Sequence, residues 1–285
     1  MTQTVTVDSH HHFWDPATAE YPWMTEDLAP IRRRFDPSDM RPLLQANGID
    51  KTVLVQTRSS VEETVEFIET AAATDFVAGV VGWVDLTKPD VGDDLARLKA
   101  RHDGRYLVGI RHQVHDEPDA DWFTRPDVQR GVAAVGAAGL AYDLLPRTRE
   151  LPACLATVRA LPDVRFVIDH IAKPPIASGR IDDWAAAMAP FADLPNVWCK
   201  LSGMVTEADW QAWTPDDLKP YADKVMGWFG EDRVLFGSDW PVSLLAAPYE
   251  RVKGALEEVL GPISPATRAK IFGANAVEVY RLPLD

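Results

Sequence analysis

Three consecutive histidines follow an apolar run near the N-terminus, and their spacing suits metal or carbonyl chemistry. His10 and His12 are separated by His11. Because side chains alternate between the two faces of a strand, His10 and His12 would project together while His11 points away. Two imidazoles on one face can bind a divalent metal or polarise a carbonyl group. An expression tag or a solvated patch is the alternative, but the apolar Phe13-Trp14 that follows does not resemble a linker.

A carboxylate and a further histidine close two other apolar runs. Asp239 stands in the GlySerAspTrpPro motif of residues 237–241, and His170 ends the run of residues 165–170. An aspartate that follows a buried strand can serve as a general base or as a metal ligand. The alternative is that Asp239 caps the helix that follows it. Three histidines and one aspartate, all close to strand ends, favour a shared site.

Positioning these side chains requires a set of strands, and eight short apolar or β-branched runs provide one. The runs occupy residues 4–8, 52–56, 76–84, 106–111, 139–144, 165–170, 196–202 and 233–239. Runs without polar alternation are typical of strands that are covered on both faces, as in parallel sheets. Successive runs repeat at about 30 residues, the length of one βα unit. The sequence therefore predicts an α/β fold, a single-domain (β/α)8 TIM barrel over residues 1–285.

Helix signals and two long intervals complete this prediction. Asp36-Pro37 opens a helix that Asn47-Gly48 closes, and Ser60 with Glu63 forms a capping box. Loop insertions are expected near residues 13–36 and 203–230. Both follow a strand, on the face where barrel enzymes place their active sites. They are candidates for loops that cover a substrate.

The composition narrows the possible partners. The net charge of −14 disfavours nucleic acid, whose phosphates bind clustered Lys and Arg, and disfavours anionic membranes. A hydrophobic fraction of 46% and a charged fraction of 25% are typical of a globular protein. The chain has two cysteines, no CxxC spacing, no signal-peptide pattern and no long apolar run. We therefore expect a cytoplasmic protein that acts on a small molecule.

Five motifs together resemble a known family. They are AspSerHisHisHisPheTrpAsp, PheValIleAspHisIleAlaLysPro, CysLysLeuSerGlyMetValThrGlu, GlySerAspTrpPro and IlePheGlyAlaAsnAlaValGluValTyrArgLeu, in this order along the chain. This set resembles the amidohydrolase superfamily, and within it the amidohydrolase-2 group of sugar lactonases of the L-fuconolactonase and L-rhamnonolactonase type. The resemblance spans nearly the whole chain.

The resemblance implies a barrel whose site lies at the carboxyl ends of the strands. There His10, His12, His170 and Asp239 would be both the catalytic residues and the ligands of a metal such as zinc. Members with two metals bridge them with a lysine on the fourth strand, where this chain has Arg111. The histidine that many members carry on the fifth strand is also missing, because Tyr142-Asp143 stands there. We therefore expect at most one divalent metal, or none.

Several residues at strand ends are candidates for substrate binding. Arg111 either forms an ion pair inside the barrel or grips a substrate oxygen, and we expect the second. His112 could reach the site, whereas His115 is expected to be solvated. Trp14, Trp23 and Trp240 could stack on a sugar ring. Trp14 and Trp240 are preferred, because each lies within two residues of a proposed catalytic group. The expected substrate contacts are Arg111, His112, Trp14, Gln56, Trp83, Asp143 and Trp240.

Three charged or reactive residues have open or structural interpretations. Strand alternation predicts that Asp169 faces away from the site and pairs with Lys173. Lys200 could bind substrate or pair with a carboxylate of the barrel. Cys199 alternates with Lys200, and no motif marks it as a nucleophile.

These expectations combine into one reaction. We predict hydrolysis of a sugar-derived aldonolactone, in which Asp239 takes a proton from the water that attacks the carbonyl. The three histidines, with or without one zinc ion, would stabilise the oxyanion. The alternatives are a decarboxylase of the same superfamily, a metal-dependent amidase, or a sugar-acid binding protein without activity.

Overall fold

The computed structural model describes residues 5–284, and its centre is a sheet of eight parallel strands in the order β1 to β8. The strands are β1 (Val7–His11), β2 (Lys51–Val55), β3 (Val77–Gly82), β4 (Leu107–His112), β5 (Ala141–Leu144), β6 (Arg165–Ile168), β7 (Val197–Leu201) and β8 (Val234–Phe236). Each predicted run overlaps one of these strands, although the first run ends three residues before β1 does. Thr4, the first residue of the first run, lies outside the described residues. The prediction of a single-domain (β/α)8 barrel is therefore confirmed.

The barrel closes where the HisHisHis motif of β1 meets the GlySerAspTrpPro motif that follows β8. His11 forms a parallel bridge with Trp240, and the N–H of His12 donates a hydrogen bond to the Trp240 carbonyl at 2.8 Å. The N–H of Asp239 donates in turn to the carbonyl of His10, also at 2.8 Å. Closure of the sheet itself therefore fixes Asp239 against the histidine strand.

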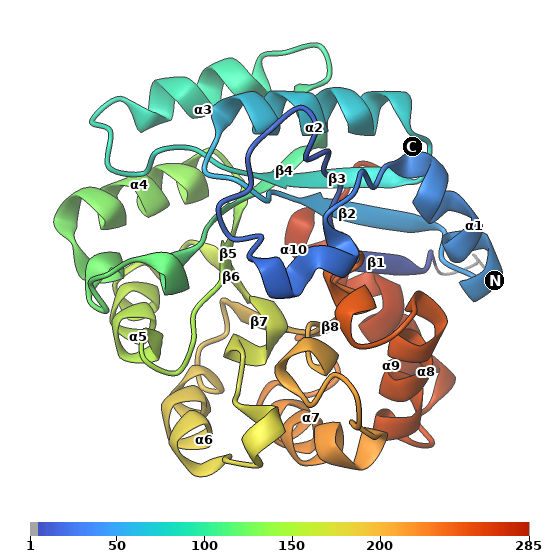
Figure 1. The fold of residues 1–285 in the computed structure, drawn as a ribbon. Helices are drawn as coiled ribbons and strands as arrows, with labels where there is room; N and C mark the ends of the chain where they lie inside the picture. The colour runs from blue at the N-terminus through green and yellow to red at the C-terminus, as the bar shows by residue number, and fades with distance from the viewer. Residues whose placement is uncertain (1–4, 285) are drawn as a thin grey trace.

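Most helices surround the strands on the outside of the barrel, as Figure 1 shows, whereas α10 closes one end. They are α1 (Pro37–Asn47), α2 (Val61–Ala73), α3 (Val91–Lys99), α4 (Pro126–Ala137), α5 (Leu151–Ala160), α6 (Asp182–Met188), α7 (Pro215–Phe229), α8 (Tyr249–Leu260), α9 (Pro265–Ala269) and α10 (Asn275–Tyr280). The predicted ends of α1 are confirmed, since Asp36 forms a capping box and Gly48 adopts a left-handed conformation at φ 64°. The predicted capping box of α2 is only half present. Ser60 caps the helix, but the Glu63 carboxylate accepts hydrogen bonds from Thr57 and Arg58 instead.

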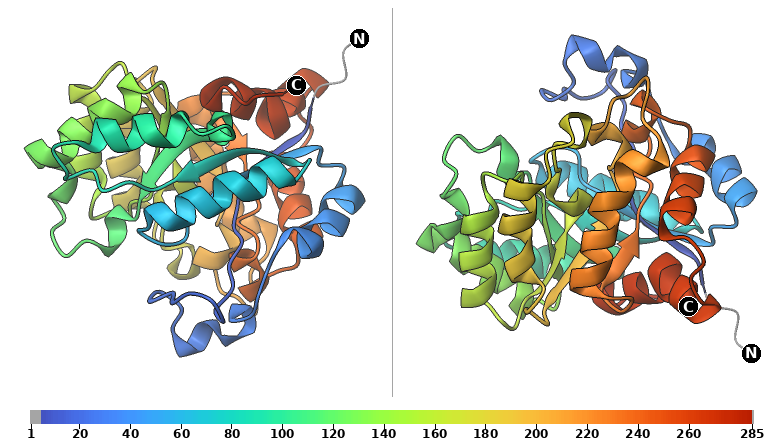
Figure 2. Two further views of the ribbon diagram at one scale, coloured as in Figure 1. Left: turned by 90° about the horizontal axis from the view of Figure 1, so that it is seen from above. Right: turned by 90° about the horizontal axis from the view of Figure 1, so that it is seen from below.

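The two ends of the barrel differ in how they are covered. Inside the barrel, a cluster of aliphatic side chains, including Val53 and Val167, packs against Val279, Tyr280 and Leu282 of the C-terminal segment. The opposite end carries the segment with the short helix η1 (Glu26–Ile31), drawn in blue and far from the C-terminus in Figure 2. Because α10 fills one end, only the end beneath η1 remains for a ligand.

The two expected insertions have different local structure. Residues 13–36 form an irregular segment that contains η1. This short helix packs against η9 (Val242–Leu245), which begins three residues after Asp239. Residues 203–230 divide into an irregular part with the short helix η8 (Val205–Glu207) and the regular helix α7. Across residues 5–284, no helix is both long and apolar enough to cross a membrane.

Candidate active site

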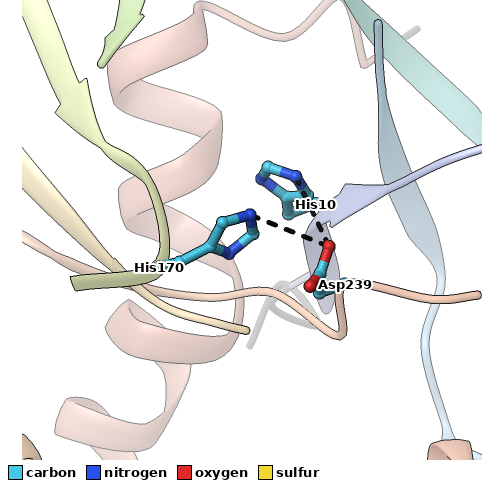
Figure 3. A group of neighbouring side chains, drawn as sticks. All are labelled: His10, His170 and Asp239. Atoms are coloured by element: carbon cyan, nitrogen blue, oxygen red, sulfur yellow. Dashed lines mark ion pairs between the residues drawn. The ribbon is translucent and has the colours of Figure 1, made fainter. Parts of the chain in front are cut away.

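Four side chains from three regions of the sequence converge at the open end of the barrel. His12 Nε2 lies 3.2 Å from His10 Nε2 and 3.4 Å from Asp239 Oδ1. The Nε2 atoms of His10 and His170 lie 3.9 and 3.7 Å from the same oxygen, and Figure 3 shows the carboxylate facing both rings. His12, His170 and Asp239 line a cavity of about 400 Å³. That volume falls within the usual range for small-molecule sites.

The buried carboxylate of Asp8 links the GlySerAsp turn of residues 237–239 to strand β1. This role could not be predicted from the sequence. Asp8 Oδ1 accepts hydrogen bonds from the N–H groups of Ser238 at 2.9 Å and His10 at 3.2 Å. The Tyr249 hydroxyl donates to Asp8 Oδ2 at 2.9 Å. Burial raises the pKa of Asp8, although these hydrogen bonds oppose the shift. Asp8 therefore holds the two motifs in register without contacting the cavity.

His170 reaches the site through an unusual backbone turn. Residues 170–173 have φ angles of 52°, 48°, 60° and 48°, so four consecutive non-glycine residues are left-handed. Each such residue costs about 1–2 kcal/mol relative to a right-handed conformation, so packing must hold the turn. Trp184 Nε1 donates to the Ile171 carbonyl at 2.7 Å, and the N–H of Lys173 donates to the His170 carbonyl at 2.8 Å. A Cβ on Gly203 would lie 2.5 Å from the His170 ring, so the ring fits only beside glycine.

The hydrogen-bond partners of the histidines prepare them as ligands. The Val55 carbonyl, which can only accept, lies 2.7 Å from His12 Nδ1, so Nδ1 carries a proton and Nε2 is the nitrogen that faces His10 and Asp239. His170 Nδ1 lies 2.9 Å from the Ser202 hydroxyl. Burial lowers the pKa of both His10 and His170 well below the ordinary value, which favours neutral imidazole. Neutral imidazole is the form that binds metals.

The donor set fits one divalent ion. The ligand atoms of His10, His170 and Asp239 all lie within 4.8 Å of one another. Two ligands about 2.0–2.1 Å from a tetrahedral zinc ion are roughly 3.3 Å apart, close to the separations around His12. Arg111 Nη1 lies 3.3 Å from His10 Nε2 and so places a positive charge beside this position. A second ion next to it would be repelled.

The prediction that Asp169 faces away and pairs with Lys173 is wrong. Asp169 is fully buried, and its Oδ2 lies 3.0 Å from Arg111 Nη1. Strand β6 ends at Ile168, so strand alternation no longer applies at Asp169. Burial opposes its charge, but Lys200, His10 and Arg111 together hold its pKa well below the ordinary value.

Arg111 forms the ion pair inside the barrel that the sequence left open as one alternative, and it also lines the cavity. Besides Asp169, it donates from Nη2 to the Gln56 carbonyl at 2.5 Å and to Gln56 Oε1 at 3.1 Å. It lines the cavity with only 3% of its surface exposed. Gln56 is fully buried behind it and does not line the cavity. The ion pair inside the barrel is therefore the dominant contact of Arg111.

Lys200 pairs with barrel carboxylates rather than with the cavity. Its Nζ lies 2.6 Å from Asp143 Oδ2 and 2.9 Å from Asp169 Oδ1, and all three side chains are fully buried. Tyr280 of α10 donates its hydroxyl hydrogen to Asp143 at 2.8 Å. Burial raises the pKa of Asp143 to about 6, with Lys200 opposing the shift. Asp143, a candidate for substrate contact, thus lies below the cavity.

The preferred aromatic candidates are not the aromatic residues that line the cavity. Trp14 is buried and donates from Nε1 to the Ile31 carbonyl at 3.1 Å. Trp240 is 1% exposed and packs edge-on against Phe35. Trp23 and Trp210 line the cavity instead. Closeness in sequence to a catalytic group does not direct an indole toward it, since neighbouring side chains point in different directions.

Trp83, which follows β3, and His112, the last residue of β4, also lie outside the cavity lining. Trp83 Nε1 donates to His112 Nδ1 at 3.0 Å, and the His112 ring stacks on Trp122 with centroids 4.3 Å apart. His112 Nε2 is 2.7 Å from Glu117 Oε1, so both ring nitrogens have protein partners. His115, expected to be solvated, lines the cavity with its side chain 12% exposed. The loop after β4 therefore turns His115 inward, in the place expected for His112.

The cavity also contains groups for which the sequence offered no signal. They come from the loops after β4, β5, β6 and β7, and include Gln113, Asp116, Arg147, Lys173 and Glu207. These loops approach one another only in the folded barrel. No local pattern distinguishes such residues from other polar loop residues.

Comparison with known proteins places the fold and the site in a family. The amidohydrolase family model matches residues 7–282. The L-fucono-1,5-lactonase of Burkholderia ambifaria is 43% identical over 98% of this chain and 96% of its own length. The L-fucono-1,5-lactonase of Burkholderia multivorans is 38% identical over 97% and 96%.

Solved structures agree with this assignment. Two crystal structures of an amidohydrolase from Burkholderia multivorans, one with bound HEPES and one with bound zinc, superpose with a TM-score of 0.92. Their sequence is 36% identical, and the match covers 98% of this chain and all of theirs. The chain belongs to the amidohydrolase family.

Proposed function

We propose that the protein hydrolyses a sugar-derived lactone, and that a six-membered 1,5-lactone of the L-fucono type is its best substrate. The observation that carries this proposal is the buried Asp239 carboxylate, which meets three imidazoles at the wall of the cavity. The two relatives with 43% and 38% identity, both named L-fucono-1,5-lactonase, support the substrate class.

Asp239 is the proton acceptor in this reaction. Burial alone would raise its pKa, but His170 and the hydrogen bond with His12 bring the pKa below the ordinary value. Ionised Asp239 takes a proton from water as the water oxygen bonds to the lactone carbonyl carbon. When the bond from that carbon to the ring oxygen breaks, Asp239 returns the proton to the ring oxygen. The product is the open-chain hydroxy acid.

One divalent metal, with zinc as the first candidate, fits this site. His12, His170, His10 and Asp239 would hold it, because their ligand atoms converge and burial favours the neutral form of His10 and His170. When bound, such an ion polarises the substrate carbonyl and stabilises the negative charge that forms on its oxygen. The zinc-bound relative, at 36% identity, supports this assignment.

The test is acid release from a panel of lactones. Purified protein is titrated at constant pH with L-fucono-1,5-lactone, with other 1,5- and 1,4-aldonolactones, and with 2,6-dihydroxybenzoate. We expect stoichiometric protons from the 1,5-lactones and the highest kcat/KM for the L-fucono compound. Release of CO₂ from the aromatic acid, without protons from any lactone, would establish the decarboxylase alternative. Saturable binding of the sugar acid with neither product would establish the binding protein.

Metal analysis accompanies the same preparation. We expect no more than one equivalent of divalent metal per chain. Two equivalents that are lost together with activity would contradict the single site.

A further inference from the structure

Lactone hydrolysis requires a partner for the carbonyl oxygen as well as a base for the attacking water. As water attacks, the carbonyl oxygen gains negative charge and needs a positive or hydrogen-donating partner. His12 Nδ1 lies 2.7 Å from the Val55 carbonyl, so the proton on this nitrogen is directed away from a ligand. A cation in the cavity wall can supply a donor to the carbonyl oxygen, whether or not a metal ion is bound beside it.

The cations near the cavity differ in how free their donors are. Arg111 uses Nη1 on Asp169 and Nη2 on Gln56, and its Nε is buried without a hydrogen-bond partner. Lys200 is fully buried between two carboxylates and does not line the cavity. Arg147 lines the cavity, but its side chain is exposed to solvent, where a hydrogen bond is weaker. Lys173 is the remaining lysine or arginine among the described lining residues.

Lys173 has the burial and the partners that such a role needs. Its side chain is 17% exposed, and its ammonium pairs with the Glu207 carboxylate, which is 20% exposed and lines the same cavity. An ammonium carries three donors, so one carboxylate oxygen leaves others for a ligand. Glu207 limits where the ammonium can lie, which lowers the entropy that is lost when a ligand binds.

The left-handed turn explains why Lys173 and His170 face the same cavity. The two residues are three apart in a single turn, as the hydrogen bond from the Lys173 N–H to the His170 carbonyl shows. Within residues 5–284, the non-glycine residues with positive φ are His170, Ile171, Ala172, Lys173, Asp239 and Arg281. All except Arg281 belong to this turn or to the proposed base. Strained backbone concentrated in this way is characteristic of functional sites.

Electrostatic effects agree with this placement. Burial is the largest influence on the pKa of His170, and the charge of Lys173 lowers that pKa further. Burial raises the pKa of Asp239, and Lys173 is among the groups that lower it, after His170 and His12. Both Lys173 and Asp239 line the cavity.

We propose that Lys173 is a catalytic residue whose ammonium donates a hydrogen bond to the lactone carbonyl oxygen, with Glu207 as its positioning residue. This proposal rests on the proposed lactonase function. As the water oxygen bonds to the carbonyl carbon, the carbonyl π electrons move to the oxygen that Lys173 holds. They return to form the carboxyl group when the ring C–O bond breaks, and the ring oxygen takes the proton from Asp239. Lys173 itself loses no proton in either step.

The test compares Lys173→Met and Lys173→Arg with Lys219→Met, a matched change at an exposed lysine of α7. We expect Lys173→Met to lower kcat on L-fucono-1,5-lactone by about 10²–10³-fold, as for loss of one oxyanion donor, with a smaller change in KM. Lys173→Arg should recover at least about tenfold, and Lys219→Met should match the wild type. Glu207→Gln should reduce kcat less than Lys173→Met does. If the methionine variant does not fold, Lys173→Gln takes its place.

Metal content and thermal unfolding are measured on every variant. A normal kcat in Lys173→Met, or a raised KM alone, would overturn the proposal. So would a loss of metal in proportion to the loss of activity, because Lys173 would then act through the metal site. A wild type that opens no lactone would refute the proposed function and, with it, the role of Lys173. If the wild type and Lys173→Met are equally active, only the role of Lys173 is refuted.

Discussion

Two layers of ionisable side chains lie one above the other in the barrel, and they are organised in opposite ways. The upper layer consists of His10, His12, His170 and Asp239, and all of these except His10 line the cavity. The lower layer, Arg111, Asp143, Asp169, Lys200 and Tyr280, is buried, and of these Arg111 alone reaches the cavity wall. In the lower layer two cations face two carboxylates, and each charge has an opposite charge within 3.0 Å. In the upper layer one carboxylate meets three imidazole rings.

This difference in charge pairing distinguishes a structural network from a binding site. A buried charge must be compensated, and the lower layer achieves this internally. The upper layer instead directs ligand atoms toward one point, where an ion or a substrate can complete it. His10 connects the two layers, since its Nδ1 lies 3.3 Å from Asp169 Oδ1 while its Nε2 lies 3.2 Å from His12 Nε2. We infer that the lower layer orients the upper layer through His10.

The largest effect is expected from removing the charge of the upper layer. Asp239→Asn should lower kcat by about 10²–10⁴-fold, the range for loss of a general base, while the protein remains folded. Steady-state kinetics on the lactone and circular dichroism check this result. Asp223→Asn, at an exposed aspartate of α7, is the control for the chemical change. Near wild-type turnover in Asp239→Asn would remove Asp239 from the mechanism.

Removing a charge from the lower layer should mainly reduce the stability of the folded protein. Lys200→Met leaves Asp143 and Asp169 with one cation, Arg111, and should reduce the free energy of unfolding by about 3–5 kcal/mol. Urea denaturation measures the change. Lys219→Met tests the same substitution in an exposed pair, where about 0–1 kcal/mol is expected. Equal stability of the two variants would show that the lower layer does not depend on its charges.

A smaller effect is expected from removing the hydrogen-bond partner of one histidine ring, His170. Ser202→Ala removes the hydroxyl that lies 2.9 Å from His170 Nδ1. Loss of such a partner to a ligand histidine lowers metal affinity or activity by about 10–100-fold. Metal titration and kcat/KM measure both quantities. Ser178→Ala, at an exposed serine, should change neither; unchanged values in Ser202→Ala would mean that Gly203 and the backbone alone orient the ring.

The smallest effect should come from the edge of the lower layer. Tyr280→Phe removes the hydroxyl that donates to Asp143, while Lys200 remains paired with the same carboxylate. We expect a loss of about 1.5 kcal/mol in unfolding free energy, the lower range for a hydrogen bond to a charged group. Activity should stay close to the wild type. A loss of activity larger than the loss of stability would mean that Asp143 acts on the upper layer directly.

The sequence alone determined the barrel and the identity of the upper layer. The eight strands could be predicted because buried parallel strands are local, continuous apolar runs, and the helix ends of α1 because Asp36 and Gly48 are local signals. Strand alternation placed His10 with His12, and Lys200 opposite Cys199. In the structure Lys200 faces the interior, while Cys199 packs in the outer core.

Only the tertiary structure decided where side chains beyond the strand ends point. Asp169 follows the end of β6, and the left-handed turn after it contains no glycine that would announce it. That turn is held by contacts from distant residues, such as Trp184 and Gly203, so no local pattern encodes it. The same reason explains why Trp23, His115 and Lys173 reach the cavity while Trp14, Trp240 and His112 do not. Backbone periodicity is a short-range property, whereas loop direction depends on packing between segments that the sequence separates widely.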